Sequence, residues 1–468
     1  MLPSSGPPLG PYAAAIAVNR FGLGARPDTA APADPRGWLL AQFDAYQPIS
    51  AAWADQPTTL ALATDFGRQR QLVAQADATT KLAAQQALGK QVRDVYRSAV
   101  TARVESALTT PTPLVERLVH FWANHFAIST EQQEVAALAG AFEAEAIRPH
   151  VLGRFEDMLL AVERHPAMQL YLDQTRSVGP DSIAALRVAQ RHPERKPGLN
   201  ENLAREIMEL HTLGVRSGYT QADVTEFARA MTGWSVASVR AAQPDLAPPG
   251  SFVFRAPLHE PGPRVVMRHS YSQADAAQGL AILHDFAIAP ATAQHIADKL
   301  ARHFVADTPP PAVVQRLATA FTASQGDLPT VYRALIEAPE AWSPSAVKFK
   351  TPWEWTLSSL RGLGLVHMGK LQAAPVLTQL GQPVWRPGSP AGYDDVAASW
   401  AAPDALVRRV ELAQRLGAGA SATTDPRLLG QALMFGTLSP QTQTAVARAE
   451  SVPTAVALLL VSPDFQRR

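Results

Sequence analysis

Apolar residues recur at three- and four-residue spacings along most of the chain, in segments rich in Ala, Leu, Gln and Arg. This periodicity is typical of amphipathic α-helices, and long β-branched runs are few. We therefore predict a mainly α fold. The predicted helices cover 67–108 with a break near Gly89, a segment opened by the prolines of "TTPTPL", and 133–146, 150–163, 199–212, 220–231, 274–285, 290–304, 311–323, 328–337, 403–416, 426–435, 440–449 and 453–461.

Residues 235–275 depart from the helical pattern. Two short β-type runs, 252–255 and 264–267, are joined by a loop rich in Pro and Gly. They predict a small β-hairpin flap inserted into the helical body. A second Pro/Gly-rich segment, "GQPVWRPGSPAGYDD" at 381–395, is too long for a simple connector, and we expect it to pack over another part of the molecule.

These changes of pattern divide the chain into five parts without any internal repeat. The large helical domain is expected to carry both the flap and a helical C-terminal portion. The parts are an N-terminal extension with a start motif (1–30), a helical core (31–234), the inserted β flap (235–275), the continued helical core (276–370), and the Pro/Gly-rich loop with C-terminal helices (371–468).

Composition narrows the classes of partner. The 42 basic and 41 acidic residues give a formal charge of +1, which disfavours nucleic acid as a partner. No apolar run reaches the roughly 18 residues of a membrane span, so no transmembrane segment is expected. The start "MLPSSGPPLG" lacks the features of a leader, which fits a cytoplasmic chain or a periplasmic or secreted one without its leader. The absence of cysteine excludes disulfides and thiolate chemistry and mildly favours an oxidising compartment.

The segment "NENLAREIMELHTLG", 200–214, has the most distinctive polar pattern. At 100° per residue, Asn202, Glu206 and Glu209 fall on one stripe about 60° wide. Two carboxylates and an amide so placed can share a proton, hold a hard divalent cation such as Ca²⁺ or Mg²⁺, or orient a sugar hydroxyl. The stripe is therefore a candidate catalytic face.

An ordinary charged helix face explains the same pattern. Arg205 is four residues from both Glu201 and Glu209, the spacing of weak surface ion pairs. His211 falls about 180° from the stripe, so a zinc site formed with the glutamates has poor geometry. The spacing leaves both interpretations open.

A second polar set lies in "VERLVHFWANHF", 115–126. His125 falls inside the apolar arc of this helix, and a buried histidine needs a hydrogen-bond partner. That partner can be structural, or His125 can serve as a ligand or catalytic group. Glu116, His120 and Asn124 form a polar stripe, which we expect to face solvent.

Two further motifs are weaker. His259 and Glu260 of "HEPGPR" sit on the predicted flap, where a His–Glu pair could cap a cleft. "KFKTPWEW", 348–355, interleaves Lys and Trp as polyanion or sugar sites do, but core tryptophans are the favoured explanation. G-x-S-x-G, Walker A, H-E-x-x-H and dinucleotide-binding signatures do not occur, which argues against common hydrolases, nucleotide enzymes and dehydrogenases.

Six stretches in order over about 19–410 resemble a large bacterial family catalogued as domain of unknown function eighteen-hundred. These stretches are "NRFGLGARP" (19–27), "FWANHFAIS" (121–129), "AMQLYLDQTRS" (167–177), "GLNENLAREIMELHTLGV" (198–215), "GYTQADVTEFARAMTGWS" (218–235) and "ATAQHIADKLARHFV" (291–305). The resemblance implies a secreted or periplasmic protein, often encoded beside a sulfatase-like partner, and work on extracellular or envelope polymers. It supplies no mechanism.

Within the 198–215 block the polar residues match the family pattern, which strengthens the functional interpretation of that helix. The chain departs from the pattern elsewhere. His259-Glu260 stands where the family usually has His-Asp, Arg264 where it has Lys, and Tyr393 where Trp is common. A longer carboxylate side chain on the flap is enough to alter specificity or activity.

Two hypotheses follow. The first is an extracytoplasmic hydrolase of glycan or another envelope polymer, using carboxylate acid–base or metal-assisted chemistry, with Ca²⁺ or Mg²⁺ as the candidate cation. The second is a non-catalytic binding or assembly partner of a secreted sulfatase-like protein. For the enzyme, the candidate catalytic residues are Glu206, Glu209, His125 and His259, and the candidate substrate-binding residues are Asn202, Arg205, Glu260 and Trp122.

Overall fold

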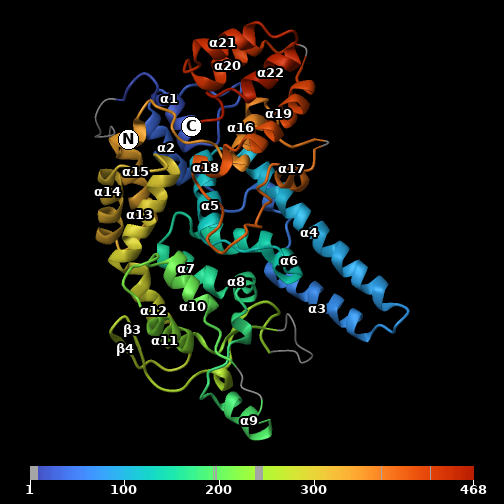
Figure 1. Cartoon of the computed structure of the whole chain (residues 1–468), viewed down its shortest axis with the longest axis vertical. Helices are drawn as coiled ribbons and strands as arrows, with labels where there is room; N and C mark the ends of the chain where they lie inside the picture. The colour runs from blue at the N-terminus through green and yellow to red at the C-terminus, as the bar shows by residue number, and fades with distance from the viewer. Residues whose placement is uncertain (1–8, 193, 195–197, 238–245, 370, 422) are drawn as a thin grey trace.

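Helices form most of the computed structural model, which describes residues 9–192, 194, 198–237, 246–369, 371–421 and 423–468 (Figure 1). The mainly α fold with a β insertion and a helical C-terminal portion is confirmed. In the first half the elements are α1 (Ala13–Ala15), α2 (Pro35–Ala45), α3 (Thr59–Gln75), α4 (Lys81–Thr109), α5 (Pro113–His125), α6 (Gln133–Phe142), α7 (Phe155–Arg164), α8 (Pro166–Tyr171), α9 (Ile183–Arg191), α10 (Asn202–Glu206) and α11 (Gln221–Met231).

The second half begins with two β-hairpins and continues as helices to the C-terminus. Its elements are β1 (Trp234–Val236), β2 (Phe252–Phe254), β3 (Arg264–Val266), β4 (His269–Tyr271), α12 (Ala276–Ile288), α13 (Pro290–Phe304), α14 (Pro311–Ala323), α15 (Leu328–Glu337), α16 (Pro352–Gly362), α17 (Ala373–Gln379), α18 (Ala397–Trp400), α19 (Pro403–Ala418), α20 (Pro426–Met434), α21 (Pro440–Ala447) and α22 (Val452–Leu460). Short 3-10 turns lie at Ala51–Trp53, Arg148–His150, Gln174–Arg176, Ala256–Leu258 and Pro339–Trp342.

One hydrophobic core runs through the described residues, from Ala13 near the start to Phe465 near the end. Helix α5 lies at its centre, and Leu118, Val119 and Trp122 on this helix have no exposed surface. Such a continuous core joins the five segments of the chain. It surrounds α5 with neighbours on every side.

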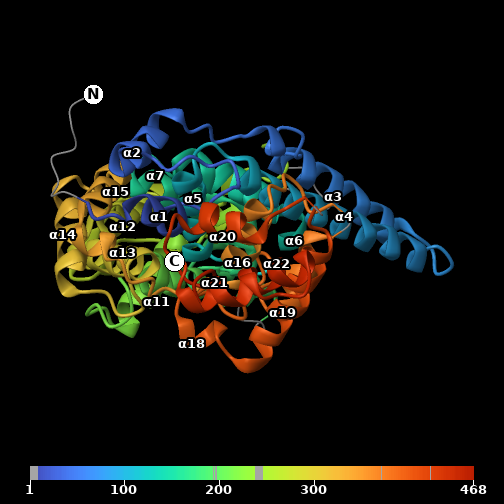
Figure 2. The ribbon, with the colours of Figure 1, turned by 90° about the horizontal axis from the view of Figure 1, so that it is seen from above.

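Helices α3 and α4 form an antiparallel hairpin that projects from the body of the molecule (Figures 1 and 2). The single helix predicted over 67–108 is therefore wrong, and so is the break near Gly89, which lies inside α4. The chain turns at residues 76–80 instead. The carboxylate of Asp77 accepts hydrogen bonds from the backbone N–H groups of Thr79 and Thr80 there, and such local bonds compete with helix formation.

The β insertion contains two hairpins. The predicted strand runs 252–255 and 264–267 contain β2 and β3, but these two strands do not pair with each other. Strand β2 pairs with β1, and β3 pairs with β4 through a turn in which Met267 and Arg268 both have positive φ. That two-residue turn allows β3 to pair with the strand that follows it at once. Part of the predicted flap, 238–245, lies outside the described residues.

Three π-helical segments interrupt the α-helical geometry, at Ile16–Phe21, Glu143–Ile147 and Ile207–His211. Segments of this kind are rare and often mark functional sites. The third follows α10 directly, so the helix predicted over 199–212 is α-helical only in its first half. Each segment carries a buried charged or ring side chain, respectively Arg20, Glu143 and His211.

The C-terminal helices α19 to α22 gather at one end of the molecule, and the C-terminus lies beside α1 (Figure 1). Arg468 is buried, and its backbone N–H donates to Lys348 O at 2.9 Å. Among the described residues, none of the helices has the length and apolar character needed to span a membrane.

Candidate functional site

The polar stripe of α10 lies at the surface. Asn202 is exposed, and Glu206 and Glu209 are half-buried. Arg205 pairs with Glu201 at 3.1 Å and lies 3.9 Å from Glu209, as expected for surface pairs at four-residue spacing. Burial raises the pKa of Glu206, while the nearby His211 opposes this effect. The stripe therefore contains one carboxyl group that holds its proton more tightly than usual.

His125 is buried on α5, and its Nε2–H donates to His211 O at 3.1 Å. Because Nε2 carries the hydrogen in this arrangement, Nδ1 is left with a lone pair, and that atom has no partner among the described residues. Burial, with Lys299 nearby, holds the pKa of His125 well below its usual range. Trp122 is a core residue whose indole donates to the Tyr332 hydroxyl at 2.6 Å.

The flap residues bind backbone groups. The Nδ1–H of His259 donates to Thr232 O at 2.8 Å. The Glu260 carboxylate is buried and accepts a hydrogen bond from the Asp181 N–H at 2.8 Å. The β-carbon position of Gly179 lies 2.6 Å from this carboxylate, so no larger residue fits there. This side of the flap is thereby attached to the loop before α9.

A cavity of about 210 Å³ lies elsewhere, between α5, α13, the start of α16 and the Pro/Gly-rich segment 381–395. Of the eight candidate residues named from the sequence, His125 lines it and the other seven do not. Larger hollows exist, such as the one between α4 and residues 367–369 and 371–375, but the 210 Å³ cavity is lined by many ionisable side chains of both signs. They are Arg103, Arg117, His120, His125, Lys299, Arg302, His303, Glu354, Asp394 and Asp395.

One wall of the cavity is the polar stripe of α5. The expectation that Glu116, His120 and Asn124 face solvent is wrong, because Glu116 is 2% and His120 8% exposed. Arg148 donates to Glu116 and lies 3.2 Å from Glu143, which also pairs with Arg103 of α4. Glu116 does not line the cavity and is covered by the core around α5, so its carboxylate forms ion pairs inside the protein.

The facing wall is a stripe of α13. His295, Lys299 and His303 recur at four-residue spacing and so lie on one side of this helix. His303 Nδ1 hydrogen-bonds to Asp395 of the Pro/Gly-rich segment, and His303 Nε2 lies 4.0 Å from Glu354. Burial lowers the pKa of His303, and Asp395 opposes this effect. The imidazole is thus held in one orientation by a carboxylate.

Two carboxylates at the base of the cavity are surrounded by cations. Glu354 pairs with Arg117 and, at 2.9 Å, with Arg468. Burial raises the pKa of Glu354, but these two guanidinium groups outweigh it and hold the pKa well below the usual range. Lys348 lies 3.4 Å from Asp395. Burial raises the pKa of Asp395, but His303 and Lys348 outweigh this effect and lower it. Both carboxylates are therefore ionised at neutral pH.

The Pro/Gly-rich segment 381–395 forms the lid of the cavity, which confirms that it packs over another part of the chain. Tyr393 N–H donates to the Asn124 side chain at 2.7 Å, and Asn124 donates back to Tyr393 O at 2.9 Å. Gly392 has φ +81°, and a β-carbon there would lie 2.3 Å from Asn124 O. Only glycine fits this contact between the segment and α5.

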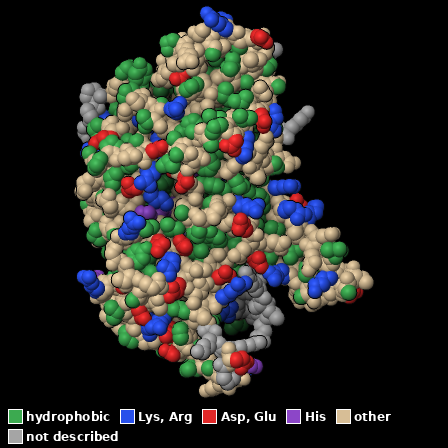
Figure 3. Space-filling view, in the orientation of Figure 1, with side chains coloured by type: hydrophobic (Ala, Val, Ile, Leu, Met, Phe, Trp, Pro, Cys, Tyr) green, Lys and Arg blue, Asp and Glu red, His purple; other side chains and the backbone are tan. Residues whose placement is uncertain are grey.

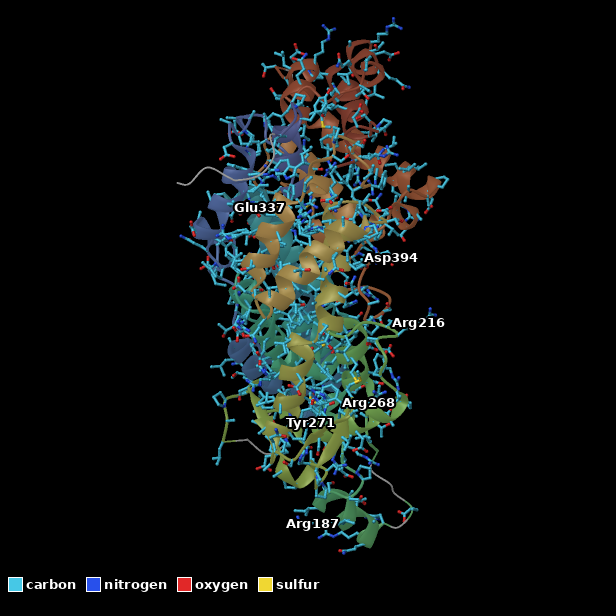
Figure 4. The ribbon with its side chains drawn as sticks, turned by 90° about the vertical axis from the view of Figure 1, so that its left-hand side faces the viewer. Arg187, Arg216, Arg268, Tyr271, Glu337 and Asp394 are labelled. Atoms are coloured by element: carbon cyan, nitrogen blue, oxygen red, sulfur yellow. The ribbon has the colours of Figure 1, made fainter. Side chains whose placement is uncertain are left out.

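The mouth of the cavity opens beside Asp394, which is exposed. In Figure 3, blue, red and purple side chains lie together on this face, over α13. Figure 4 places Asp394, Arg216 and Arg268 along one edge of the molecule. Charged groups of both signs therefore lie on this side of the molecule.

Within the part of the chain that the structure describes, no group of three or more His, Cys, Asp or Glu side chains has the geometry of a metal site. Glu206 and Glu209 do not form such a group with a third ligand. The divalent cation remains a prediction without a ligand set.

A family model described as "Protein of unknown function (DUF1800)" matches residues 16–467. The chain belongs to this family. No curated protein and no solved structure matches the chain. Membership confirms the resemblance inferred from the sequence motifs.

Two motifs that identify this DUF1800 protein also supply the cavity. The block 121–129 contains His125, and the block 291–305 contains the α13 stripe. Sequence reasoning assigned no role to Lys299 or His303, although their spacing from His295 was a detectable signal. Glu354 and Asp395 carried no such signal, because each becomes a neighbour of His303 only through tertiary folding.

Proposed function

We propose that this DUF1800 protein is an enzyme that hydrolyses a bond in a glycan or another envelope polymer, with its active site in the cavity between α5, α13, α16 and segment 381–395. The observation that carries the proposal is His303, oriented by Asp395, at the wall of a cavity that opens to solvent. A histidine held in this way is the usual general base in water activation.

The hydrogen bond to Asp395 fixes the tautomer of His303. Nδ1 carries the hydrogen and donates to the carboxylate, so the lone pair is on Nε2, which has no hydrogen-bond partner among the described residues. Because the pKa of His303 is lowered, the ring is neutral at pH 7 and can take a proton from water. Glu354, 4.0 Å from Nε2, stabilises the imidazolium that results, and this imidazolium returns the proton to the leaving group.

The α10 stripe is the competing location for the same chemistry. Glu206 has a raised pKa, which suits a general acid, and Glu209 lies one turn away. Asn202 and Arg205 would then orient substrate. The experiment therefore has to separate the cavity from the stripe.

The test measures release of reducing ends from a panel of neutral and acidic polysaccharides by the purified protein. We compare His303→Gln with Glu206→Gln and with His284→Gln, an exposed histidine of α12. Loss of a general base lowers the rate by about 10²- to 10⁴-fold. We expect that loss for His303→Gln alone, with thermal unfolding of each variant as the check on folding.

Two results would contradict the proposal. If the wild type releases no reducing ends from any polysaccharide, hydrolysis of glycans is not its activity. If Glu206→Gln loses activity while His303→Gln keeps it, the active site lies on α10.

The second candidate function is that of an assembly partner of a secreted sulfatase-like protein. The projecting α3–α4 hairpin favours it, because Leu60, Leu72 and Leu82 are 50–63% exposed there. Exposed apolar side chains on a projecting element favour contact with another protein. Gel filtration of the chain mixed with the sulfatase-like protein tests this: Leu72→Glu should abolish co-elution, and no co-elution by the wild type would refute it.

A further inference from the structure

The cations of the cavity differ in how far their charge is neutralised. Arg103 pairs with Glu143 at 2.6 Å, Arg117 pairs with Glu354, and Arg302 pairs with Asp298 at 2.8 Å. Lys299 also lines the cavity, but within the described residues its ammonium group makes no ion pair and no hydrogen bond. It is the cation at this site whose charge is least compensated.

Charged and ring groups of both kinds surround Lys299, among them the carboxylate of Asp395 and the guanidinium of Arg302. Lys299 lowers the pKa of both His125 and His295, and Arg302 lies close enough to lower the pKa of Lys299 itself. Burial is the main reason why the pKa of Lys299 is lowered to about 8, and the carboxylate of Asp395 opposes this effect by raising the pKa. An ammonium group in such a place is destabilised until an anion joins it.

Asp395 is already committed to other groups. It binds His303 through one oxygen and lies 3.4 Å from Lys348 and 3.9 Å from Arg468 through the other. An additional cation gains little from a carboxylate that already has three positive or hydrogen-bonding neighbours. An anion that enters the cavity would supply the charge compensation that Lys299 lacks.

We propose that the cavity recognises an anionic group on a sugar unit, and that Lys299 binds this group with Arg302 beside it. The shared chemistry is a carboxylate, sulfate or phosphate ester. This inference rests on the proposed function, because it names the substrate class of the same cavity. Arg216 and Arg268 are exposed along the same edge of the molecule as Asp394 (Figure 4).

Calorimetric titration tests the proposal with four probes: glucuronic acid, glucose 6-sulfate, glucose 6-phosphate and neutral glucose. Lys299→Met removes the charge and keeps the length of the side chain. Lys90→Met is the matched control, since Lys90 is an exposed lysine of α4 outside the cavity. A charge-assisted contact in a cavity corresponds to about tenfold or more in affinity.

We expect at least one anionic sugar to bind about tenfold or more tightly than glucose, and Lys299→Met, but not Lys90→Met, to remove that difference. Which of the three anions binds best distinguishes carboxylate, sulfate and phosphate. Lys299→Arg keeps the charge and should keep most of the preference. Equal binding of glucose and all three anionic sugars overturns the inference, and so does a preference that survives in Lys299→Met.

The two proposals fail in different ways. If the wild type hydrolyses neutral polysaccharides at rates that Lys299→Met leaves unchanged, the anion site is refuted and the hydrolase remains. If an anionic sugar binds through Lys299 but no polysaccharide is cleaved, the anion site stands and the hydrolase is refuted.

Discussion

Three buried histidines should make the protein lose stability as the pH falls from 7 to 5. Burial lowers the pKa of His165 to about 3 and, with Arg103, that of His120 to about 4, and it holds the pKa of His125 well below the usual range. In the unfolded chain all three titrate near 6.5. Since the folded-state pKa is the lower one, the stabilising contribution is complete above pH 6.5. It is lost as the pH falls from there toward 4 and 3.

Two of the three rings also accept a hydrogen bond at the nitrogen that would take the proton. His165 Nδ1 accepts from Ala167 N–H at 3.1 Å, and His120 Nδ1 accepts from the Trp353 indole at 3.1 Å. Protonation of either Nδ1 would break these bonds inside the protein. Between pH 7 and 5 each histidine then costs about 2 kcal/mol, and the three together on the order of 6 kcal/mol.

The assay is urea unfolding followed by tryptophan fluorescence at half-unit steps from pH 8 to pH 5. His165→Asn is the informative variant, because asparagine can still cap α8 and no longer titrates. We expect its loss of stability between pH 7 and 5 to be about 2 kcal/mol smaller than that of the wild type. His284→Asn, at an exposed histidine, should leave the slope unchanged.

A wild-type stability that stays constant or rises between pH 7 and 5 would refute the reasoning. So would a His165→Asn variant with the full wild-type slope, since this histidine would then not titrate with unfolding.

Two further predictions concern the ion pairs and the lid. Arg148→Met leaves two buried glutamates without their shared partner, so it should lower the free energy of unfolding by about 3–5 kcal/mol. Arg68→Met removes an exposed ion pair and should lower it by less than about 1 kcal/mol. Thermal unfolding measures both variants. Equal losses would contradict this. Gly392→Ala should displace the lid from Asn124 and reduce polysaccharide hydrolysis, while the helical circular dichroism signal is retained. Gly388→Ala is the control, because a β-carbon at Gly388 meets no neighbour, and this variant should keep full activity.

Local chemistry explains why many helices could be predicted from the sequence. The predicted bounds 311–323 and 328–337 match α14 and α15, and Thr220, at the start of the helix predicted over 220–231, forms a reciprocal capping box with Asp223. These features depend on residues within a few positions of one another. Periodicity and capping therefore locate such helices without knowledge of the rest of the chain.

Expectations about which side chains face solvent were wrong where a residue's neighbours are distant in the sequence. The stripe of α5 looked solvent-facing because its helix is polar on one side, yet Glu116 meets Arg148, and His120 meets Trp353. The tryptophans of "KFKTPWEW" are in the core as favoured, with the Trp355 indole donating to Leu460 O at 2.8 Å. Periodicity identifies the polar side of a helix but does not show what covers that side.

By itself, the sequence determined the mainly α class, most helix positions and the family, because these depend on local spacing and on motifs that need no partner. Only the tertiary structure decided the candidate site. His303 on α13, Glu354 on α16 and Asp395 in the Pro/Gly-rich segment are 41 to 92 residues apart. These residues meet because helix packing brings distant parts of the chain together. No local sequence pattern indicates which charged groups will become neighbours in this way.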